Sequence, residues 1–336
     1  MSENKGTIKV LQHESNVLKS NPLGDPHTRE LYVYLPPGYD MGDKNYPVAY
    51  CLTGFTGRGK MMLNDSAFSP NMAERLDKLI ESGTMKPMIV VMPDCFTRYG
   101  GSQYLNSSAT GNYEDYLTKE IVPFIDENFR TIDSRESRAI TGKSSGGYGA
   151  MIMAMRHAEL FGLATTIAGD CYFELCYKPD FRKALKAING DPLKLVEKFY
   201  DEESKKGKFA FDGLNTIGMA SCYSPNPASE WGFDIPFDLG TGEIREDVWQ
   251  EWLKNDPVYL LEESAENLKT LRLFFIDAGT SDEFALDLGA RVLVDRLKKH
   301  DIPHVHEEFD GGHFNINFRY KRTFELISEN ILDEST

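Results

Sequence analysis

The sequence lacks an excess of basic residues, a long apolar run and any pattern of paired cysteines. Its 37 lysines and arginines stand against 52 aspartates and glutamates, which gives a formal net charge of −15. Nucleic acids and anionic membranes repel such a chain, so the charge disfavours non-specific binding to either. The longest apolar stretch, near Met88–Met92, is far too short to cross a bilayer.

The five cysteines are odd in number and have no paired spacing. Cys51 and Cys95 lie in apolar runs typical of buried strands, so we expect free thiols and a reducing compartment. The first ten residues, MSENKGTIKV, contain no apolar stretch of the kind that a secretory signal needs. We therefore expect a soluble, cytoplasmic protein, while a chain from which a signal had been removed would look the same.

The 336 residues, 41% of them apolar, are enough for a sizeable core. At ~150 residues per domain, this length gives two domains or one large α/β domain with an insertion. Short apolar runs that suit buried strands alternate with segments of helical spacing. The expected strands are 7–18, 29–35, 47–52, 87–93, 138–141, 163–168, 271–276 and 304–309, and the expected helices are 112–129, 150–156, 285–300 and 318–331. This order predicts an α/β fold, with a mostly parallel central sheet and helices on both faces.

Residues 171–267 interrupt the alternation. They hold all three tryptophans and many tyrosines and phenylalanines, and they are longer than an ordinary connection between a helix and a strand. We expect a single domain over residues 1–336, with residues 171–267 as an aromatic-rich, lid-like insertion. Its aromatic side chains would form either a wall for an acyl group, an aromatic acid or a sugar ring, or a small core of the insertion itself.

The most informative motif is Gly142-Lys-Ser-Ser-Gly-Gly147. It matches G-x-S-x-G, follows a short apolar strand and precedes a helical segment, which is the setting of a nucleophile elbow. In such an elbow a sharp turn lifts the serine hydroxyl above the sheet edge, and small residues on either side leave room for the turn. Gly142 and Gly146 supply that room for Ser144, the predicted nucleophile. The alternative is a glycine- and serine-rich turn without chemistry.

A catalytic serine needs a base, and the base needs an orienting acid. After a nucleophile elbow the acid comes first in the chain and the histidine second. Asp282 and His313 follow two consecutive expected strands, and residues at the ends of such strands face ligands. We therefore predict Asp282 as the acid and His313 as the base. Asp277 and Asp170, also near strand ends, are rivals for the acid.

Several further polar residues have plainer interpretations. Glu283 is expected to belong to the start of the next helix, and His157 to be structural or exposed to solvent. His304 and His306 share one face of a strand, as a pair of metal ligands would, but no third ligand with zinc spacing is evident. We therefore expect neither a metal nor a cofactor.

Acyl transfer also needs donors for the developing oxyanion. We expect one from the backbone N–H of Ser145 and the other from the turn after strand 47–52, where the Phe55 N–H is the favoured donor. The same turn opens the segment Gly54–Met61, which comes within one residue of a phosphate-binding loop. Met61 stands where that loop requires a hydroxyl for Mg²⁺, which disfavours nucleotide binding.

With these residues assembled, the chain resembles the putative-esterase family of α/β-hydrolases, which includes esterase D, feruloyl esterases and enterochelin-esterase-like enzymes. The segments that carry the resemblance are Arg29–Pro37, Leu52–Gly57, Gly111–Thr131, the Ser144 elbow, Ala278–Phe284 and Gly311–Phe314. The resemblance implies an α/β-hydrolase fold, the roles already given to Ser144, Asp282 and His313, and oxyanion donation by Phe55 and Ser145.

The chain departs from the family at two positions beside the site. Thr53-Gly54 stands where many members have His-Gly, and Ser145 stands where many have Met. The insertion has no clear match, so the family's substrates do not carry over.

We expect a serine carboxylic-ester hydrolase that forms an acyl-enzyme with a small-to-medium acyl or aromatic ester. Thioester hydrolysis of the S-formylglutathione type and acyl transfer use the same groups and stay open, and a catalytically silent binding protein is a remote alternative. The expected partner is a small-molecule ester, without nucleic acid or membrane insertion. Homo-oligomerisation stays open.

Overall fold

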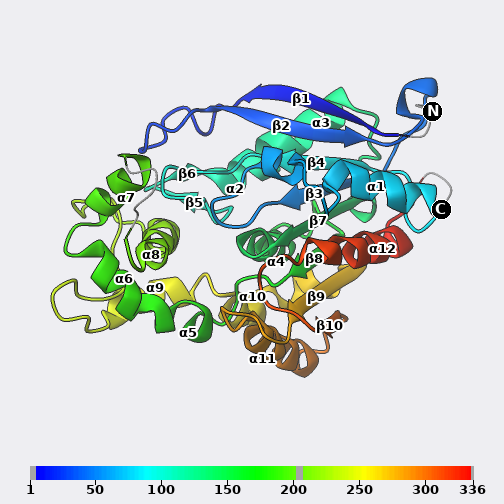
Figure 1. Cartoon of the computed structure of the whole chain (residues 1–336). Coiled ribbons are helices and arrows are strands. Elements are labelled where there is room, and N and C mark those ends of the chain that lie inside the picture. Colours follow the sequence, from blue (N-terminus) through cyan, green and yellow to red (C-terminus); the bar gives the residue numbers. More distant parts are fainter. Residues whose placement is uncertain (1–4, 202–206, 334–336) are drawn as a thin grey trace.

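A computed structural model describes residues 5–201 and 207–333. At its centre is an eight-stranded sheet with the order β1-β2-β4-β3-β7-β8-β9-β10 (Figure 1). The strands are β1 (Thr7–Glu14), β2 (Thr28–Leu35), β3 (Val48–Leu52), β4 (Ile89–Pro93), β7 (Arg138–Lys143), β8 (Leu163–Ile167), β9 (Leu273–Gly279) and β10 (Val305–Phe309). Only β2 pairs antiparallel with its neighbours, and the other pairs are parallel. The predicted mostly parallel sheet is confirmed.

Helices cover both faces of this sheet, as the alternation in the sequence predicts. The helices of these layers are α1 (Met72–Glu81), α4 (Ser145–Arg156), α10 (Pro257–Lys269), α11 (Leu286–Lys299) and α12 (Tyr320–Asn330). α4 lies against β3, β7 and β8, while α12 crosses β8 and β9 and contacts α1. Strands β3, β4 and β8 are buried along their whole length, which explains why they read as continuous apolar runs.

The expected helix 112–129 is divided into three parts. α2 (Tyr113–Asp115) passes into a π-helical segment, η3 (Tyr116–Ile121), and then into α3 (Val122–Asn128). Pro123 has no N–H to donate to the carbonyl four residues earlier, and its ring crowds that carbonyl. We attribute the wider π turn before α3 to this proline. A two-stranded ribbon, β5 (Asn106–Ser107) and β6 (Gly111–Asn112), precedes α2.

Three other boundaries differ from those expected. The strand expected over 7–18 ends at Glu14, because the chain turns where the Ser15 N–H donates to the His27 carbonyl. The strand expected to end at 276 continues to Gly279, and the nucleophile helix expected from 150 begins at Ser145. In that helix the glycines are buried against the sheet, and tertiary packing outweighs their poor helix propensity.

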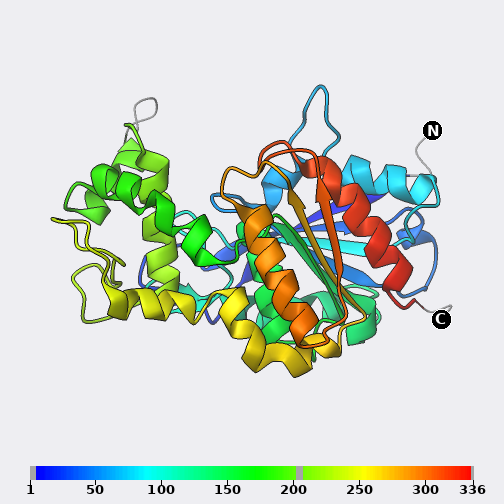
Figure 2. The same ribbon diagram turned by 90° about the horizontal axis from the view of Figure 1, so that it is seen from below.

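Most of the expected insertion forms a helical lobe beside the sheet, visible to the left in both views (Figures 1 and 2). Its helices are α5 (Phe173–Cys176), α6 (Phe181–Ile188), α7 (Pro192–Asp201), α8 (Ala210–Tyr223) and α9 (Glu246–Leu253). Trp249 and Trp252 are buried there and stack edge-on against Phe181, so they form a core within the lobe. α10 lies inside the expected insertion but packs on α4 and α11.

Two further observations concern the whole described chain. The five cysteines are all buried and carry free thiols. Among the helices formed by residues 5–201 and 207–333, none combines the length and apolar character that a bilayer crossing requires.

Candidate active site

The predicted nucleophile turn joins β7 to α4. Ser144 lies between the two elements with φ 57° and ψ −129°, a conformation that non-glycine residues rarely adopt. Its N–H donates to the Ile167 carbonyl of β8 at 3.0 Å, and its carbonyl accepts from the Tyr148 N–H of α4 at 2.9 Å. These two hydrogen bonds fix the turn to the neighbouring strand and to the first turn of the helix.

Glycines allow the elbow to pack this closely. A Cβ atom on Gly142 would lie 2.3 Å from the carbonyl carbon and oxygen of Gly146, and a Cβ on Gly146 would lie 2.3 Å from the Leu52 carbonyl oxygen. Both contacts are with backbone atoms, which cannot move aside as a flexible side chain can. The requirement for glycine at these two positions is therefore steric.

Three side chains that are distant in the sequence meet at the carboxyl edge of the sheet. The Oγ of Ser144 lies 2.9 Å from Nε2 of His313, and Nδ1 of the same ring lies 2.9 Å from Oδ2 of Asp282. The Asp282 side chain is 0% exposed and that of His313 is 6% exposed. The arrangement allows proton transfer between the serine and the imidazole in a site that excludes most water.

Asp282 and His313 are held by different neighbours. Oδ1 of Asp282 accepts the Phe284 N–H at 2.9 Å and the Leu286 N–H at 3.4 Å, so Asp282 bonds the backbone where α11 begins. We expected Glu283 at that helix start, and this was wrong. Glu283 instead accepts the backbone N–H of His313 at 2.6 Å.

Gly312 explains why Glu283 can reach this position. A Cβ on Gly312 would lie 2.7 Å from Oε2 of Glu283, so the carboxylate occupies the space that a side chain would need. No motif in the sequence linked residue 283 to residue 313, because the contact depends on two loops that meet at neighbouring strand ends.

The two proposed oxyanion donors, Phe55 and Ser145, line one pocket with Ser144 and His313. A Cβ on Gly54 would lie 3.2 Å from Cβ of Ser144, so the turn after β3 runs directly beside the serine. The next two amides of this turn are occupied, because Thr56 N–H donates to the Gly100 carbonyl and Gly57 N–H donates to the Gly54 carbonyl. The start of the segment considered as a phosphate loop, Gly54 and Phe55, thus lines the serine pocket.

The pocket has a volume of about 150 Å³, and aromatic side chains form part of its walls. The aromatic residues that line it are Phe55, Tyr177, Phe211, Phe284 and Phe314. Tyr177 and Phe211 belong to the helical lobe, whereas the tryptophans Trp249 and Trp252 lie in the lobe's own core. The aromatic residues of the lobe are therefore divided between the wall of the serine pocket and the lobe's own core.

Asp170, the geometric rival for the acid, also lines this pocket. Its Oδ2 accepts hydrogen bonds from the Ser145 hydroxyl at 2.9 Å, from the Tyr177 hydroxyl at 2.8 Å and from the Gln103 amide at 3.4 Å. Burial raises the pKa of Asp170, although the Tyr177 hydrogen bond opposes this. The sequence analysis missed this hydroxyl network, because its members are far apart in the chain and form no motif.

Asp277, His304 and His306 do not line the serine pocket. Asp277 lies within β9 and forms an ion pair with Arg319 at 2.6 Å, and burial raises its pKa to about 6. His304 Nδ1 is 2.8 Å from the Ile302 carbonyl oxygen. In the part of the chain that the structure describes, no three His, Cys, Asp or Glu side chains cluster as a metal site.

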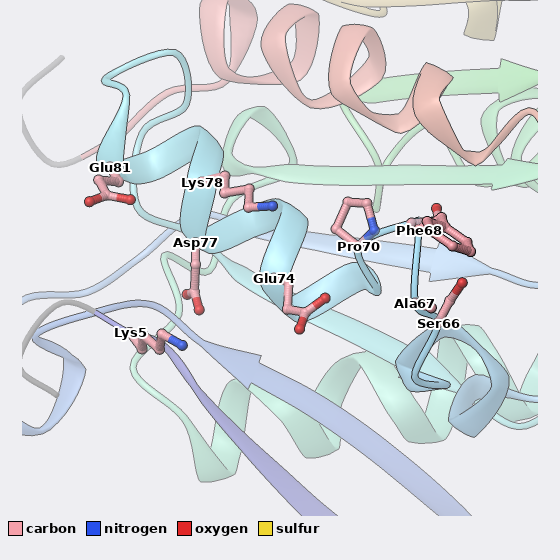
Figure 3. A pocket seen from close by; sticks show the side chains of 10 residues that line it. Lys5, Ser66, Ala67, Phe68, Pro70, Glu74, Asp77, Lys78 and Glu81 are labelled. Atoms are coloured by element: carbon pink, nitrogen blue, oxygen red, sulfur yellow. The ribbon is translucent and has the colours of Figure 1, made fainter. Parts of the chain in front are cut away.

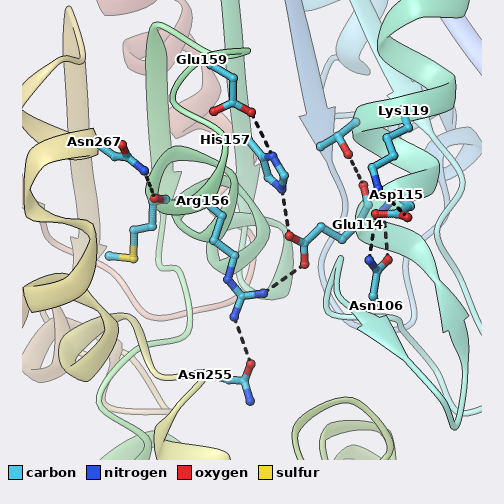
Figure 4. A network of polar contacts seen from close by, with 11 residues as sticks. Asn106, Glu114, Asp115, Lys119, Arg156, His157, Glu159, Asn255 and Asn267 are labelled. Atoms are coloured by element: carbon cyan, nitrogen blue, oxygen red, sulfur yellow. Dashed lines mark hydrogen bonds and ion pairs between the residues drawn. The ribbon is translucent and has the colours of Figure 1, made fainter.

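His157 lies at the C-terminal end of α4 (Figure 4). Its Nε2 is 2.8 Å from Glu114 and its Nδ1 is 3.2 Å from Glu159. Burial alone would lower the pKa of His157, but the two carboxylates outweigh burial and raise it. This histidine is structural, as expected.

The fold places the chain among the α/β-hydrolases. A ferulic acid esterase structure matches with a TM-score of 0.61 and 19% identity over 98% of this chain and 99% of that chain. An S-formylglutathione hydrolase from Agrobacterium tumefaciens matches with a TM-score of 0.60 and 20% identity over 99% and 98%. At this level of identity, the likeness concerns the fold alone.

The sequence comparisons identify the family. The model of the family described as "Putative esterase" matches residues 23–328, and the chain belongs to that family. An endo-1,4-beta-xylanase/feruloyl esterase from Xylanibacter ruminicola is 32% identical over 146 residues, which are 42% of this chain and 19% of that protein. An S-formylglutathione hydrolase from Bos taurus is 26% identical over 190 residues, 51% of this chain and 60% of that protein. The chain therefore spans less than two thirds of these curated relatives.

Proposed function

We propose that the protein is a serine carboxylic-ester hydrolase that acts through an acyl-enzyme. One observation carries the proposal: Ser144 Oγ, the His313 ring and the Asp282 carboxylate form a continuous chain of contacts, each 2.9 Å long, at the wall of a pocket. Membership of the "Putative esterase" family and the names of the relatives support the same activity.

In the first step, Ser144 attacks the ester carbonyl while Nε2 of His313 takes its proton. Nδ1–H of His313 donates to Asp282, which fixes the tautomer and stabilises the imidazolium that forms. The carbonyl oxygen becomes an oxyanion held by the backbone N–H groups of Phe55 and Ser145. Loss of one such donor typically costs about 2.7–4 kcal/mol in the transition state.

The intermediate then collapses, the bond to the alcohol oxygen breaks, and His313 gives its proton to that oxygen. The acyl group stays on Ser144 until a water molecule, deprotonated by His313, attacks it. The bond between the acyl carbon and Ser144 Oγ then breaks, His313 returns the proton to Oγ, and the acid leaves. Each step uses only groups of this chain, the ester and water. His313 takes up one proton and gives up one proton in each half-reaction, so it ends each one neutral.

The pocket volume of about 150 Å³ favours a small acyl group. A thioester presents the same carbonyl to Ser144, so a thioester hydrolase is the second candidate, supported by the relatives named S-formylglutathione hydrolase. An acyltransferase would differ only in the acceptor that attacks the acyl-enzyme. Comparing the turnover of an oxyester with that of a thioester of the same acid distinguishes the first two activities.

We also infer that α5–α9 form a cap over the site. The support is that Tyr177, after α5, and Phe211, in α8, line the serine pocket. The cap would end before α10, which belongs to the helices around the sheet. A cytoplasmic location remains a prediction from the sequence.

The test is hydrolysis of p-nitrophenyl acetate together with labelling by a fluorophosphonate probe. We expect the wild type to turn over the ester and to be labelled, and the Ser144→Ala variant to lose labelling and about 10⁶-fold in kcat. Ser108→Ala, at an exposed serine, is the matched control and should behave as the wild type. Normal activity in Ser144→Ala would exclude the proposed nucleophile, and failure of the wild type to be labelled would favour a silent binding protein.

A further inference from the structure

A second cavity adjoins the serine pocket. This groove has a volume of about 510 Å³ and shares Gly54 and Lys143 with the pocket of Ser144. Its other walls come from the segment between η2 (Gly59–Leu63) and α1, and from the loop after His313, which contributes Asn315. A substrate whose ester bond lies at Ser144 can therefore extend on one side into the small aromatic pocket and on the other into this groove.

Lys143 stands at the boundary between the pocket and the groove. It is half-buried, and burial lowers the pKa of its ammonium group, while the negative charge of Asp282 opposes this effect. Within residues 5–201 and 207–333, the ammonium group of Lys143 has no hydrogen bond and no ion pair. A partly desolvated ammonium group that bonds to no carboxylate is unusual, because buried charges are normally paired.

The groove contains a second cation without a carboxylate partner. Arg75 reaches it from α1 and donates one hydrogen bond, to the Pro70 carbonyl at 3.3 Å. Burial lowers the pKa of Arg75 too, and none of the carboxylates that the structure describes forms an ion pair with it. The one acidic residue that lines the groove, Asp65, is exposed to solvent.

The charged residues that line the cavity on the opposite side of α1 are mainly acidic. This cavity has a volume of about 810 Å³ and is lined by Glu74, Asp77 and Glu81, with Lys5 and Lys78 beside them (Figure 3). The sequence as a whole carries a net charge of −15. The groove therefore presents two cations that lack a carboxylate partner beside Ser144, whereas the charged residues of the cavity across α1 are mainly acidic.

We propose that the groove binds the alcohol part of the substrate and that this part carries an anionic group, a carboxylate or a phosphate, recognised by Lys143 and Arg75. The inference rests on the proposed esterase function. The acyl group must stay on Ser144 between the two steps, whereas the alcohol must leave and water must enter. The narrow pocket suits the retained group and the larger groove suits the leaving one.

The test compares two esters of the same acid, 4-acetoxybenzoate and its neutral isostere 4-acetoxybenzamide. The readout is the ratio of kcat/KM for the anionic ester to kcat/KM for the neutral one. We expect a ratio of about ten in the wild type, the scale of one charge-assisted hydrogen bond. Lys143→Met and Arg75→Gln should each lower the ratio by about tenfold, chiefly through KM, and Lys143→Arg should retain it.

The ratio separates charge recognition from damage to the elbow, because a distorted Ser144 slows both esters alike. Lys78→Met removes a cation from the other side of the same helix and is the matched control, with an unchanged ratio expected. Added salt should lower the ratio in the wild type.

A ratio near one in the wild type, or one that both substitutions leave unchanged, would overturn the inference. If both esters are hydrolysed without preference, only this inference fails. If neither ester is hydrolysed and the fluorophosphonate probe does not label Ser144, the proposed function fails with it.

Discussion

Helix α4 has a histidine–carboxylate pair at each end, and the two pairs have nearly the same contact distance. At its N-terminal end, His313 and Asp282 are 2.9 Å apart beside Ser144. At its C-terminal end, His157 and Glu114 are 2.8 Å apart (Figure 4). His313 also lines the pocket that contains the Ser144 hydroxyl. A short contact between imidazole and carboxylate therefore does not by itself define a catalytic site.

The second nitrogen of each ring makes the difference. Nε2 of His313 faces the Ser144 hydroxyl, whereas Nδ1 of His157 faces a second carboxylate, that of Glu159. Two carboxylates favour the cationic ring, which has no lone pair left to accept a proton. Arg156 also binds Glu114. Burial would raise the pKa of Glu114, but its partners His157 and Arg156 outweigh burial and lower this pKa. His157, with Glu114 and Glu159, therefore forms a structural ion-pair cluster at the end of α4, which we call the latch. His313 at the start of α4 keeps one ring nitrogen directed at the Ser144 hydroxyl.

Replacing each carboxylate by its amide gives the largest expected contrast in kcat between the two pairs. Asp282→Asn should lower kcat on p-nitrophenyl acetate by about 10⁴-fold, because an amide neither fixes the tautomer nor stabilises the imidazolium. Glu114→Gln should leave kcat within about threefold but lower the free energy of unfolding by about 1–2 kcal/mol, because it weakens charge-assisted hydrogen bonds in the latch. Steady-state kinetics and urea unfolding of both variants measure these effects. Equal losses of kcat in the two variants would remove the distinction between the pairs.

Glu283→Gln probes the support of His313, the proposed base, and should have a smaller effect. Its carboxylate accepts the His313 N–H at 2.6 Å and touches neither Ser144 nor the pocket. A glutamine can still accept that hydrogen bond through its carbonyl oxygen, so we expect kcat to fall by about tenfold or less. Glu283→Ala, which removes the acceptor, should cost more than Glu283→Gln. Equal losses in the two variants would show that the charge of Glu283, which both variants remove, matters more than its hydrogen bond.

The latch should also show a pH dependence of stability, the smallest of the three effects. The pKa of His157 is raised in the folded protein above its ordinary value of 6.5. The stabilisation by the protonated ring is therefore fully present below pH 6.5 and is lost as the pH rises through the raised pKa. Urea unfolding across that range should show a difference between the wild type and His157→Gln that shrinks as the pH increases. A difference that grows with pH would contradict this sign.

The sequence pattern predicted the elements of the sheet well because its strands are buried on both faces and therefore apolar throughout. It also led to Ser144, Asp282 and His313, because the elbow has a steric signature and the other two follow consecutive strands. It did not reveal the contact of Glu283 with His313, the network around Asp170 or the position of Arg75. Those contacts join segments through tertiary packing alone, and no spacing along the chain records them.

The backbone at Ser144 carries a further consequence for the evolution of the protein. With φ at 57°, the position would suit glycine better than any residue that has a Cβ atom. Selection for stability alone would favour glycine at this position, so the strained serine agrees with a role for its hydroxyl in the proposed reaction.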